Sequence, residues 1–317
     1  MIDRSGYLPL IAAALLSVPA FTDAAPFAYV PNEGSGTVSV IDTANDQVVA
    51  DIPAGKKPRG LAAGADNHWL YVSDQPNNRL QLIDLRKRAP AGTIALGESP
   101  EGVYISPDGR WVAAAIEESN DIAITDATSN KLAFTIKVQG RNPEHAVFSP
   151  DGRKLFVSAE DGDAVDIIDF EARKQVAQVP VGARPRGIGF LPDSSRAYVA
   201  AENSNEVYVI DTSTHKIVAH IKAGLRANGI AVHPDGSRVY VSNGGDASVS
   251  VIDTKTNTII ATIPAGQRPW NMAITPDGKK LYVANGRSNS VSVIDTVQNV
   301  KLRDVAVGKL PWGVVIK

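Results

Sequence analysis

Residues 224–266 read GLRANGIAVHPDGSRVYVSNGGDASVSVIDTKTNTIIATIPAG, and the pattern of this stretch indicates how the chain folds. It holds four short runs rich in β-branched residues, and turn-forming residues separate them at 234–236, 243–246 and 253–257. Runs of this length between such residues are typical of β-strands joined by tight turns. The stretch therefore predicts one unit of four antiparallel strands.

The pattern of this stretch recurs along the chain. An aspartate that ends a strand-like run falls at Asp42, Asp84, Asp126, Asp169, Asp211, Asp253 and Asp295. The steps between them are 42, 42, 43, 42, 42 and 42 residues, and a glycine recurs in the same phase at Gly55, Gly97, Gly140, Gly182, Gly224, Gly266 and Gly308. A period of roughly 40 to 45 residues with four strands per repeat is typical of β-propeller blades.

The two ends of the chain predict how the ring closes. The first repeat begins at 27–30, with the motif of a second strand, and has no inner strand of its own. The chain ends with an extra inner-strand motif at 312–316. We therefore expect an all-β, seven-bladed β-propeller with four antiparallel strands per blade, a single domain over residues 26–317 in which the C-terminal strand closes the first blade.

Composition excludes several classes of function. The chain has 317 residues, 44% of them hydrophobic, and a formal net charge of -2, so it has no global positive field for nucleic acid. It has no cysteine, which excludes disulfides, thiolate zinc sites and thiol nucleophiles. His residues are few and scattered, and no nucleotide-binding motif occurs, so we expect neither a metal nor a cofactor.

Residues 1–25 have the pattern of a secretory signal peptide. Arg4 precedes an apolar run over 8–18, and small residues follow at Ala20, Ala24 and Ala25. The run is too short to span a bilayer, and no second long apolar stretch follows it. We therefore expect an exported, periplasmic protein, with an uncleaved, membrane-tethered start as the alternative.

The repeats resemble the YVTN family of β-propellers, which are largely bacterial and often secreted. The resemblance rests on Tyr-Val-Ser-Asp at 71–74, Tyr-Val-Ser-Asn at 240–243, the Pro-Asp-Gly turns and the Val-Ser-Val-Ile-Asp-Thr runs. The ending at 307–315 is similar to that of propellers associated with PQQ-dependent alcohol catabolism. The resemblance implies a periplasmic accessory or binding protein more than an enzyme.

One end of the central channel carries the candidate site. The loops that enter the inner strands hold nine basic residues against three acidic ones, whereas the turns between second and third strands on the same face are mostly acidic. This distribution predicts a cationic channel mouth inside an acidic outer rim. The residue that starts each inner strand differs between blades, and with one neighbouring histidine these positions are the candidate ligand-binding residues: Arg59, Glu101, Glu144, His145, Arg186, Asn228, Trp270 and Trp312.

Arginines beside tryptophans favour stacking, cation–π and anion contacts. We therefore expect a small anionic or aromatic ligand, or a periplasmic partner's acidic segment, at the mouth. The alternative is that Trp270 and Trp312 plug the channel while the charges pair across it.

Three functions stay open from the sequence. The first is a non-catalytic binding propeller. The resemblance to propellers associated with PQQ-dependent alcohol catabolism implies that it would be an accessory of alcohol oxidation. The second is a lactonase-like hydrolase that would use Glu101, Glu144, His145 and Arg186 at the channel. The third is single-stranded nucleic-acid binding through the basic mouth and the tryptophans, against which the near-neutral charge and the acidic rim argue.

Overall fold

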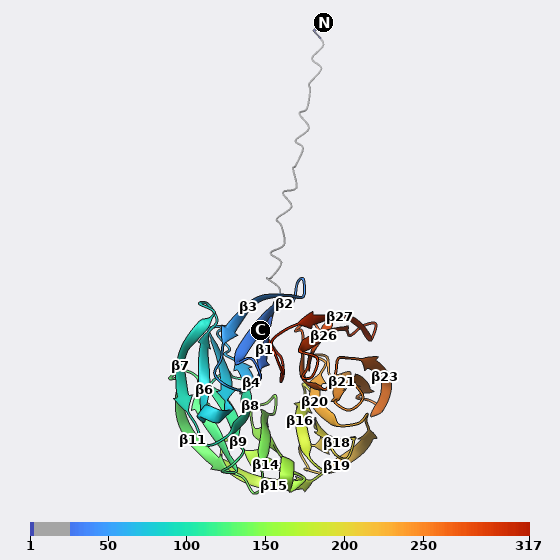
Figure 1. The fold of residues 1–317 in the computed structure, drawn as a ribbon. Helices are drawn as coiled ribbons and strands as arrows, with labels where there is room; N and C mark the ends of the chain where they lie inside the picture. The colour runs from blue at the N-terminus through green and yellow to red at the C-terminus, as the bar shows by residue number, and fades with distance from the viewer. Residues whose placement is uncertain (3–25) are drawn as a thin grey trace.

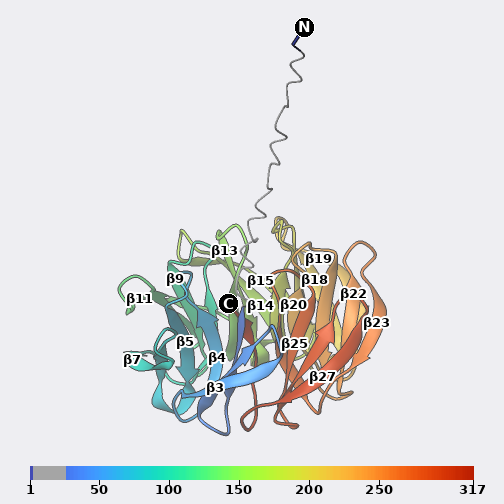
Figure 2. The same cartoon turned by 90° about the horizontal axis from the view of Figure 1, so that it is seen from above.

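The computed structural model describes residues 1–2 and 26–317, so the expected signal peptide lies almost entirely outside the described residues. Seven four-stranded antiparallel sheets are arranged as blades in a ring, as the sequence predicted (Figure 1). Figure 2 shows the same ring turned by 90°, with the strands running between its two faces. No helix among the described residues is long and apolar enough to cross a membrane.

Each blade runs from an inner strand at the channel to an outer strand at the rim. The inner strands are β4 (Pro58–Ala63), β8 (Pro100–Ile105), β12 (Pro143–Phe148), β16 (Pro185–Phe190), β20 (Ala227–Val232), β24 (Pro269–Ile274) and β28 (Val315–Ile316). The second strands are β1 (Phe27–Asn32), β5 (Trp69–Asp74), β9 (Trp111–Ile116), β13 (Lys154–Ala159), β17 (Arg196–Ala201), β21 (Arg238–Asn243) and β25 (Lys280–Asn285).

The outer half of each blade is equally regular. The third strands are β2 (Thr37–Asp42), β6 (Arg79–Asp84), β10 (Asp121–Asp126), β14 (Ala164–Asp169), β18 (Glu206–Asp211), β22 (Ser248–Asp253) and β26 (Ser290–Asp295). The outer strands are β3 (Gln47–Pro53), β7 (Ala89–Ala95), β11 (Lys131–Lys137), β15 (Lys174–Pro180), β19 (Ile217–Lys222), β23 (Thr258–Pro264) and β27 (Val300–Ala306). Two short 3-10 helices, η1 (Gln75–Asn77) and η2 (Glu160–Gly162), follow β5 and β13.

The C-terminal strand closes the ring. β28 pairs antiparallel with β1, so that the first blade has the order β28-β1-β2-β3. The backbone N–H of Lys317 donates to the carbonyl of Phe27, and the N–H of Phe27 donates back. The N–H of Trp312 donates to the carbonyl of Pro31 at 2.9 Å. This confirms the closure that the sequence predicted; blade 1 is this closing blade, and blades 2 to 7 follow in chain order.

The core lies between blades. Each of the seven hydrophobic clusters combines buried apolar residues from two neighbouring blades, and most of these residues lie on the second and third strands. Tyr71, Tyr198, Tyr240 and Tyr282 are fully buried at these junctions. Because every blade packs against two neighbours, the ring is one cooperative body.

The repeated aspartates and Pro-Asp-Gly triplets form turns. Each repeated aspartate accepts a backbone N–H from two or three residues further on: Asp42, Asp84, Asp126, Asp169, Asp211, Asp253 and Asp295. The last residue of each triplet has a positive φ, between 71° and 74°, at Gly109, Gly152, Gly236 and Gly278. These acids are therefore structural, as their sequence context predicted.

The strand directions define two faces. The loops that enter the inner strands and the turns between second and third strands lie on one face, which we call the mouth face. The turns between first and second strands and between third and outer strands lie on the opposite face, which we call the rear face.

Candidate functional site

Local structure places one side chain of each repeat at the channel mouth. In six repeats this mouth residue directly follows a proline. The proline ring fixes the φ angle of the proline itself at a value that suits the start of the inner strand. In five of the entering loops, the residue two positions before this side chain donates its backbone N–H to an Asn or Asp side chain of the preceding blade. For example, Asp163 Oδ1 accepts the backbone N–H of Arg184 at 2.9 Å, and Asn205 Oδ1 accepts that of Arg226 at 2.7 Å. Each blade thus positions the loop of the next one.

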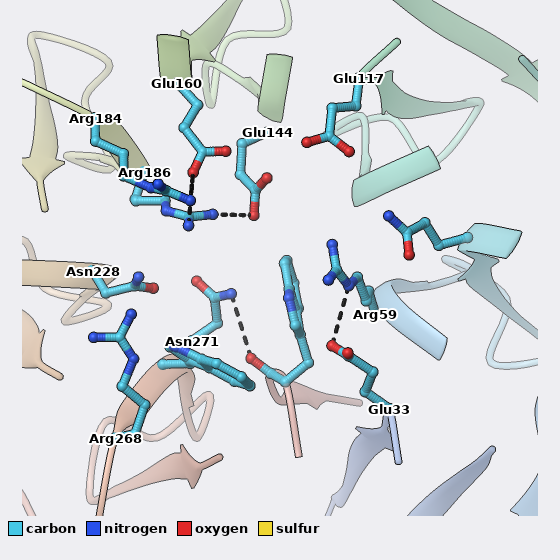
Figure 3. A pocket seen from close by; sticks show the side chains of 13 residues that line it. Glu33, Arg59, Glu117, Glu144, Glu160, Arg184, Arg186, Asn228, Arg268 and Asn271 are labelled. Atoms are coloured by element: carbon cyan, nitrogen blue, oxygen red, sulfur yellow. Dashed lines mark hydrogen bonds and ion pairs between the residues drawn. The ribbon is translucent and has the colours of Figure 1, made fainter. Parts of the chain in front are cut away.

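The mouth contains a cavity of about 240 Å³. Two groups of side chains line it. We call the first, which is uncharged, the aromatic wall: Trp270, Trp312, Asn228 and Asn271. We call the second, which apart from Gln75 is charged, the charged wall: Glu33, Arg59, Gln75, Glu117, Glu144, Glu160, Arg184, Arg186 and Arg268 (Figure 3).

Trp270 stands on the backbone of a neighbouring turn. A Cβ added to Gly286 would lie 2.7 Å from the indole Cε3 atom, so a larger residue there would push the ring from its position. The indole N–H groups of Trp270 and Trp312 make no hydrogen bond to any described residue. The aromatic wall therefore offers ring faces and two N–H donors to the cavity.

Arg186 is the centre of the charged wall. Its guanidinium pairs with Glu144 at 2.6 Å, Glu160 at 2.7 Å and Glu202 at 3.0 Å (Figure 3 shows the first two). Glu202 also accepts from Arg268 at 2.6 Å. The Arg186 side chain is 15% exposed and the three carboxylates 5% or less, so these charges are largely removed from water. Buried charges need such pairing because an isolated buried ion is very costly.

Arg59 organises the far side of the cavity. Its Nη1 pairs with Glu101 Oε1 at 2.5 Å and its Nε with Glu33 Oε2 at 3.1 Å. Gln75 Nε2 also donates to Glu101 Oε1, at 3.0 Å. Glu101 is fully buried behind Arg59 and does not line the cavity.

The expected separation of charges is wrong. The turns between second and third strands were assigned to an acidic outer rim, but Glu33, Glu117 and Glu160 line the cavity. Glu33, Glu160 and Glu202 pair with arginines of the entering loops. The physical reason is that these turns lie directly beside the entering loops, where each buried guanidinium requires a carboxylate. The mouth is a mixed network, in agreement with the alternative that charges pair across it.

Burial and crowding of like charges shift the titration of these carboxyl groups. Burial, followed by the nearby Glu144 carboxylate, raises the pKa of Glu101 to about 8. The same two causes raise the pKa of Glu160 to about 7. Glu144 and Glu202 are also buried, but the arginines around them, Arg186 first, hold the pKa of each below its ordinary value. The mouth therefore holds both ionised and readily protonated carboxyl groups.

His145 and Asn271 occupy equivalent positions in two repeats; Asn271 and Trp312 form the floor of the mouth, and His145 lies behind it. At the position after the axial residue most repeats have glycine, as at Gly60 and Gly102, but these two repeats have a side chain. His145 is 1% exposed, its Nδ1 lies 2.8 Å from the Tyr104 hydroxyl, and its ring centre lies 5.5 Å from that of Trp312. Burial lowers its pKa to about 4.

The floor divides the channel into two cavities. Asn271 and Trp312 line the mouth cavity and also a second, mostly apolar cavity of about 320 Å³ on the rear side. Asn271 Nδ2 donates to the Trp312 carbonyl at 3.5 Å (Figure 3). A ligand at the mouth therefore meets a closed floor.

The structure brings most of the predicted site residues together. Six of the eight line the mouth cavity, and the other two, Glu101 and His145, lie behind it. Seven other residues line the cavity and are not among the eight: Glu33, Gln75, Glu117, Glu160, Arg184, Arg268 and Asn271. The two arginines belong to the basic entering loops, and the three glutamates belong to the turns expected at the outer rim. Asn271 had a signal, because a side chain replaces the glycine of other repeats; Gln75 had none.

One cavity residue has an unused polar group. Asn228 is 4% exposed and its side-chain amide makes no hydrogen bond within residues 26–317. It lines the cavity between Arg186 and Arg268. A buried amide normally has a partner, so this one is available to a ligand or to ordered water. Across the same described range, no group of three or more potential metal-ligating side chains is placed to hold an ion.

Comparison with known proteins extends the description of the fold. A profile described as YNCE-like beta-propeller matches residues 4–317. No curated protein matches the chain. Among solved structures, Kuenenia stuttgartiensis hydrazine synthase has a TM-score of 0.78 at 22% identity, covering 90% of this chain and 99% of that one.

Two further solved structures are similar. A protein of unknown function from Desulfotomaculum acetoxidans has a TM-score of 0.80 at 19% identity, covering 92% of this chain and 98% of that one. A protein described as a putative 6-phosphogluconolactonase from Bacteroides fragilis has a TM-score of 0.79 at 19% identity, covering 95% of this chain and 100% of that one. Identities this low show a shared fold alone.

Proposed function

The chain belongs to the YNCE-like β-propeller family, and from this premise we propose that its channel mouth binds a small anionic ligand with a flat ring and releases it unchanged. The observation that carries the proposal is the convergence of two tryptophans, unused hydrogen-bonding groups and several arginines on one cavity of about 240 Å³. Ring faces recognise flat ligands, and guanidinium groups recognise carboxylates and phosphates.

The charge balance around Glu202 favours an anion on that side of the mouth. Around Glu202, four guanidinium groups, those of Arg184, Arg186, Arg226 and Arg268, face three carboxyl groups, those of Glu144, Glu160 and Glu202. Because the pKa of Glu160 is raised to about 7, this carboxyl group is partly neutral near pH 7. A ligand carboxylate beside Arg268 and Asn228 would balance the excess positive charge.

Fluorescence titration tests this function. Benzoate and glucuronate are the anionic probes, and benzyl alcohol and glucose are their neutral controls. We expect the anions to quench tryptophan fluorescence saturably and Arg268→Gln or Trp270→Ala to weaken binding about tenfold. Arg287→Gln is the matched control, because Arg287 is exposed on the same face and does not line the cavity. Equal binding of neutral and anionic probes, or unchanged binding by both variants, contradicts the proposal.

A lactonase-like hydrolase is the second candidate. Glu160 lines the cavity with a pKa raised to about 7, which suits a proton donor or acceptor near neutral pH. Similar propellers described as putative 6-phosphogluconolactonases also favour it. Against it, His145 lies outside the cavity lining, so the expected carboxylate–imidazole pair does not face a substrate there.

Lactone hydrolysis separates the two candidates. With 6-phosphogluconolactone as substrate, a protein that only binds should leave the rate of lactone hydrolysis equal to the rate in buffer alone. Hydrolysis above that rate that is lost in Glu160→Gln and kept in Arg287→Gln would establish the enzyme instead.

We further propose that the protein acts in the periplasm, beside PQQ-dependent alcohol oxidation. The signal-peptide pattern of residues 1–25 and the family-like ending at 307–315 support this location and context. Co-purification of a PQQ dehydrogenase from the periplasmic fraction tests it. Recovery of the full-length chain only from the cytoplasm contradicts the location.

A further inference from the structure

On the rear face, three successive blades differ from the other four in the type of residue at one position of the repeat. The first residue of each second strand is Phe27, Trp69 and Trp111 in blades 1 to 3, whereas it is Lys154, Arg196, Arg238 and Lys280 in blades 4 to 7. These seven positions are equivalent in the repeat, so the chain uses aromatic rings on one arc of the ring and cations on the other.

The four cations join neighbouring blades. Each donates to the carbonyl of a threonine in the next blade: Lys154 to Thr212, Arg196 to Thr254, Arg238 to Thr296 and Lys280 to Thr43. These side chains fill the rear end of their junctions. The aromatic residues of blades 1 to 3 make no such bond to a neighbouring carbonyl in the described chain.

A groove opens at each of the three aromatic junctions. The groove beside Phe27 has a volume of about 350 Å³, the one beside Trp69 about 300 Å³ and the one beside Trp111 about 440 Å³. The third is the most aromatic, since Phe134 and Phe170 join Trp111 in its wall. We call this series the aromatic arc.

Cations cover the rings of the aromatic arc. The guanidinium of Arg88 lies 5.3 Å from the centre of the Phe27 ring, that of Arg110 4.6 Å from Trp111, and that of Arg173 3.9 Å from Phe134. A guanidinium stacked on a ring keeps its N–H edge free for an anion.

Cations and carboxylates both line the arc but differ in how they are engaged. The exposed guanidinium groups of Arg86, Arg88, Arg153 and Arg173 have no hydrogen-bond or ion-pair partner among the described residues. The neighbouring carboxylates remain charged, and the exposed Glu171 lines the third groove, but the oxygens of four aspartates accept local N–H or O–H groups in turns: Asp84, Asp126, Asp151 and Asp169. The arc thus offers guanidinium groups without a partner beside apolar grooves.

We propose that the aromatic arc docks an acidic polypeptide segment of a partner protein, whose apolar side chains enter the grooves and whose carboxylates meet the stacked arginines. Aromatic residues and arginines are the side chains that contribute most to protein interfaces. A nucleic acid fits less well, because Arg88, Arg110 and Arg173 already cover ring faces on which bases would stack.

Fluorescence anisotropy tests the proposal with three probes: a labelled peptide of alternating glutamate and leucine, a labelled peptide of alternating lysine and leucine, and a labelled oligothymidylate. We expect the full chain to bind the acidic peptide in preference to the other two. The double variant Arg88→Glu, Arg173→Glu should weaken this binding about tenfold or more and remove most of its salt dependence.

The matched control is Lys255→Glu with Lys279→Glu, two exposed cations on the rear face of blades 6 and 7, outside the arc. It should leave acidic-peptide binding unchanged. A second variant, Trp111→Lys, introduces the residue of the equivalent position in β13 and should weaken binding by closing the groove. Failure of the acidic peptide to bind, equal effects of both double variants, or tighter binding of the oligothymidylate would each overturn the proposal.

Discussion

At the scale of single residues, the mouth depends on Arg186. Its guanidinium holds three carboxylates that would otherwise repel one another in a site largely closed to water. Burial, together with this crowding, raises the pKa of Glu160 and leaves the group around Glu202 with a slight positive excess. Structure and function therefore place opposite demands on these side chains, since paired charges stabilise the ring and unpaired ones bind a ligand.

Removal of Arg186 should be strongly destabilising. Arg186→Leu leaves Glu144, Glu160 and Glu202 without their main counter-charge, and breaking a buried pair costs about 3–5 kcal/mol. Arg226→Leu is the control, because Arg226 is 58% exposed and its pairing with Glu202 at 3.4 Å should contribute less than about 1 kcal/mol. Urea unfolding measures both, and equal losses would contradict the account.

The raised carboxyl pKa values predict a pH dependence of stability. The pKa of Glu101 in the folded protein is raised to about 8, so the folded state binds more protons than the unfolded state below that pH. The free energy of unfolding should therefore fall as the pH rises from 6.5 to 8. His145 acts in the opposite sense only at lower pH, because burial lowers its pKa from 6.5 to about 4.

Glu101→Gln should reduce this fall. Urea unfolding at several pH values in the window measures it, with Glu98→Gln as a control because Glu98 is exposed on the same face. A wild-type stability that rises with pH between 6.5 and 8 would contradict the assignment.

The sequence predicted six of the residues that line the mouth cavity and misjudged their partners. A proline before Arg59, Glu101, Glu144 and Arg186 marked the start of each inner strand, and the repeat placed all four near the axis. The direction of a turn side chain has no such periodic signal. The sequence therefore assigned Glu160 to an outer rim, where the structure turns it inward to Arg186.

At the scale of elements, the short C-terminal strand has a large role. It supplies the inner strand of blade 1, and together with the preceding Val314 its residues Val315 and Ile316 join hydrophobic clusters on both sides of the closure. Both β1 and the channel would be exposed without it. An unpaired strand edge is a template for association with other chains.

Deletion of residues 313–317 should therefore open the ring. We expect a large drop in the melting temperature and oligomers in size-exclusion chromatography. Lys317→Ala is the control, since it keeps the backbone bonds to Phe27. A monomeric deletion variant that melts with the wild type would show that β28 does not close the ring.

Lys280 forms a second clasp across the same closure. Its ammonium group donates to the Thr43 carbonyl at 2.9 Å and pairs with Asp46 at 2.9 Å, joining blades 7 and 1. Lys280→Met should cost about 1–3 kcal/mol in urea unfolding, because the Asp46 carboxylate is largely buried. Lys279→Met, at an exposed position, should change stability little. Similar stabilities of the two variants would contradict a role for the clasp.

At the scale of the whole molecule, the repeat allowed the fold to be predicted from the sequence, but it did not reveal the aromatic arc. Period, strand number and closure follow from residues 224–266 and the chain ends, because each repeat must bury its faces against its neighbours. The aromatic arc was not predicted, because Phe27, Trp69 and Trp111 read as ordinary strand residues until the cations of the other blades are seen to bridge the junctions.

The closed ring should also unfold as one unit. Every cluster of the core is shared by two blades, so no blade can leave without exposing its neighbours. Far-ultraviolet and near-ultraviolet circular dichroism should give coincident urea transitions. Two separated transitions would indicate independent groups of blades.

The most direct test of the binding site is a crystal structure of the protein soaked with glucuronate. We expect the sugar ring to pack against Trp270 or Trp312, with its carboxylate beside Arg268 and the Asn228 amide. Glucuronate seen only outside the mouth, or a mouth filled with water at a saturating concentration, would contradict the claim that this cavity binds small anionic ligands.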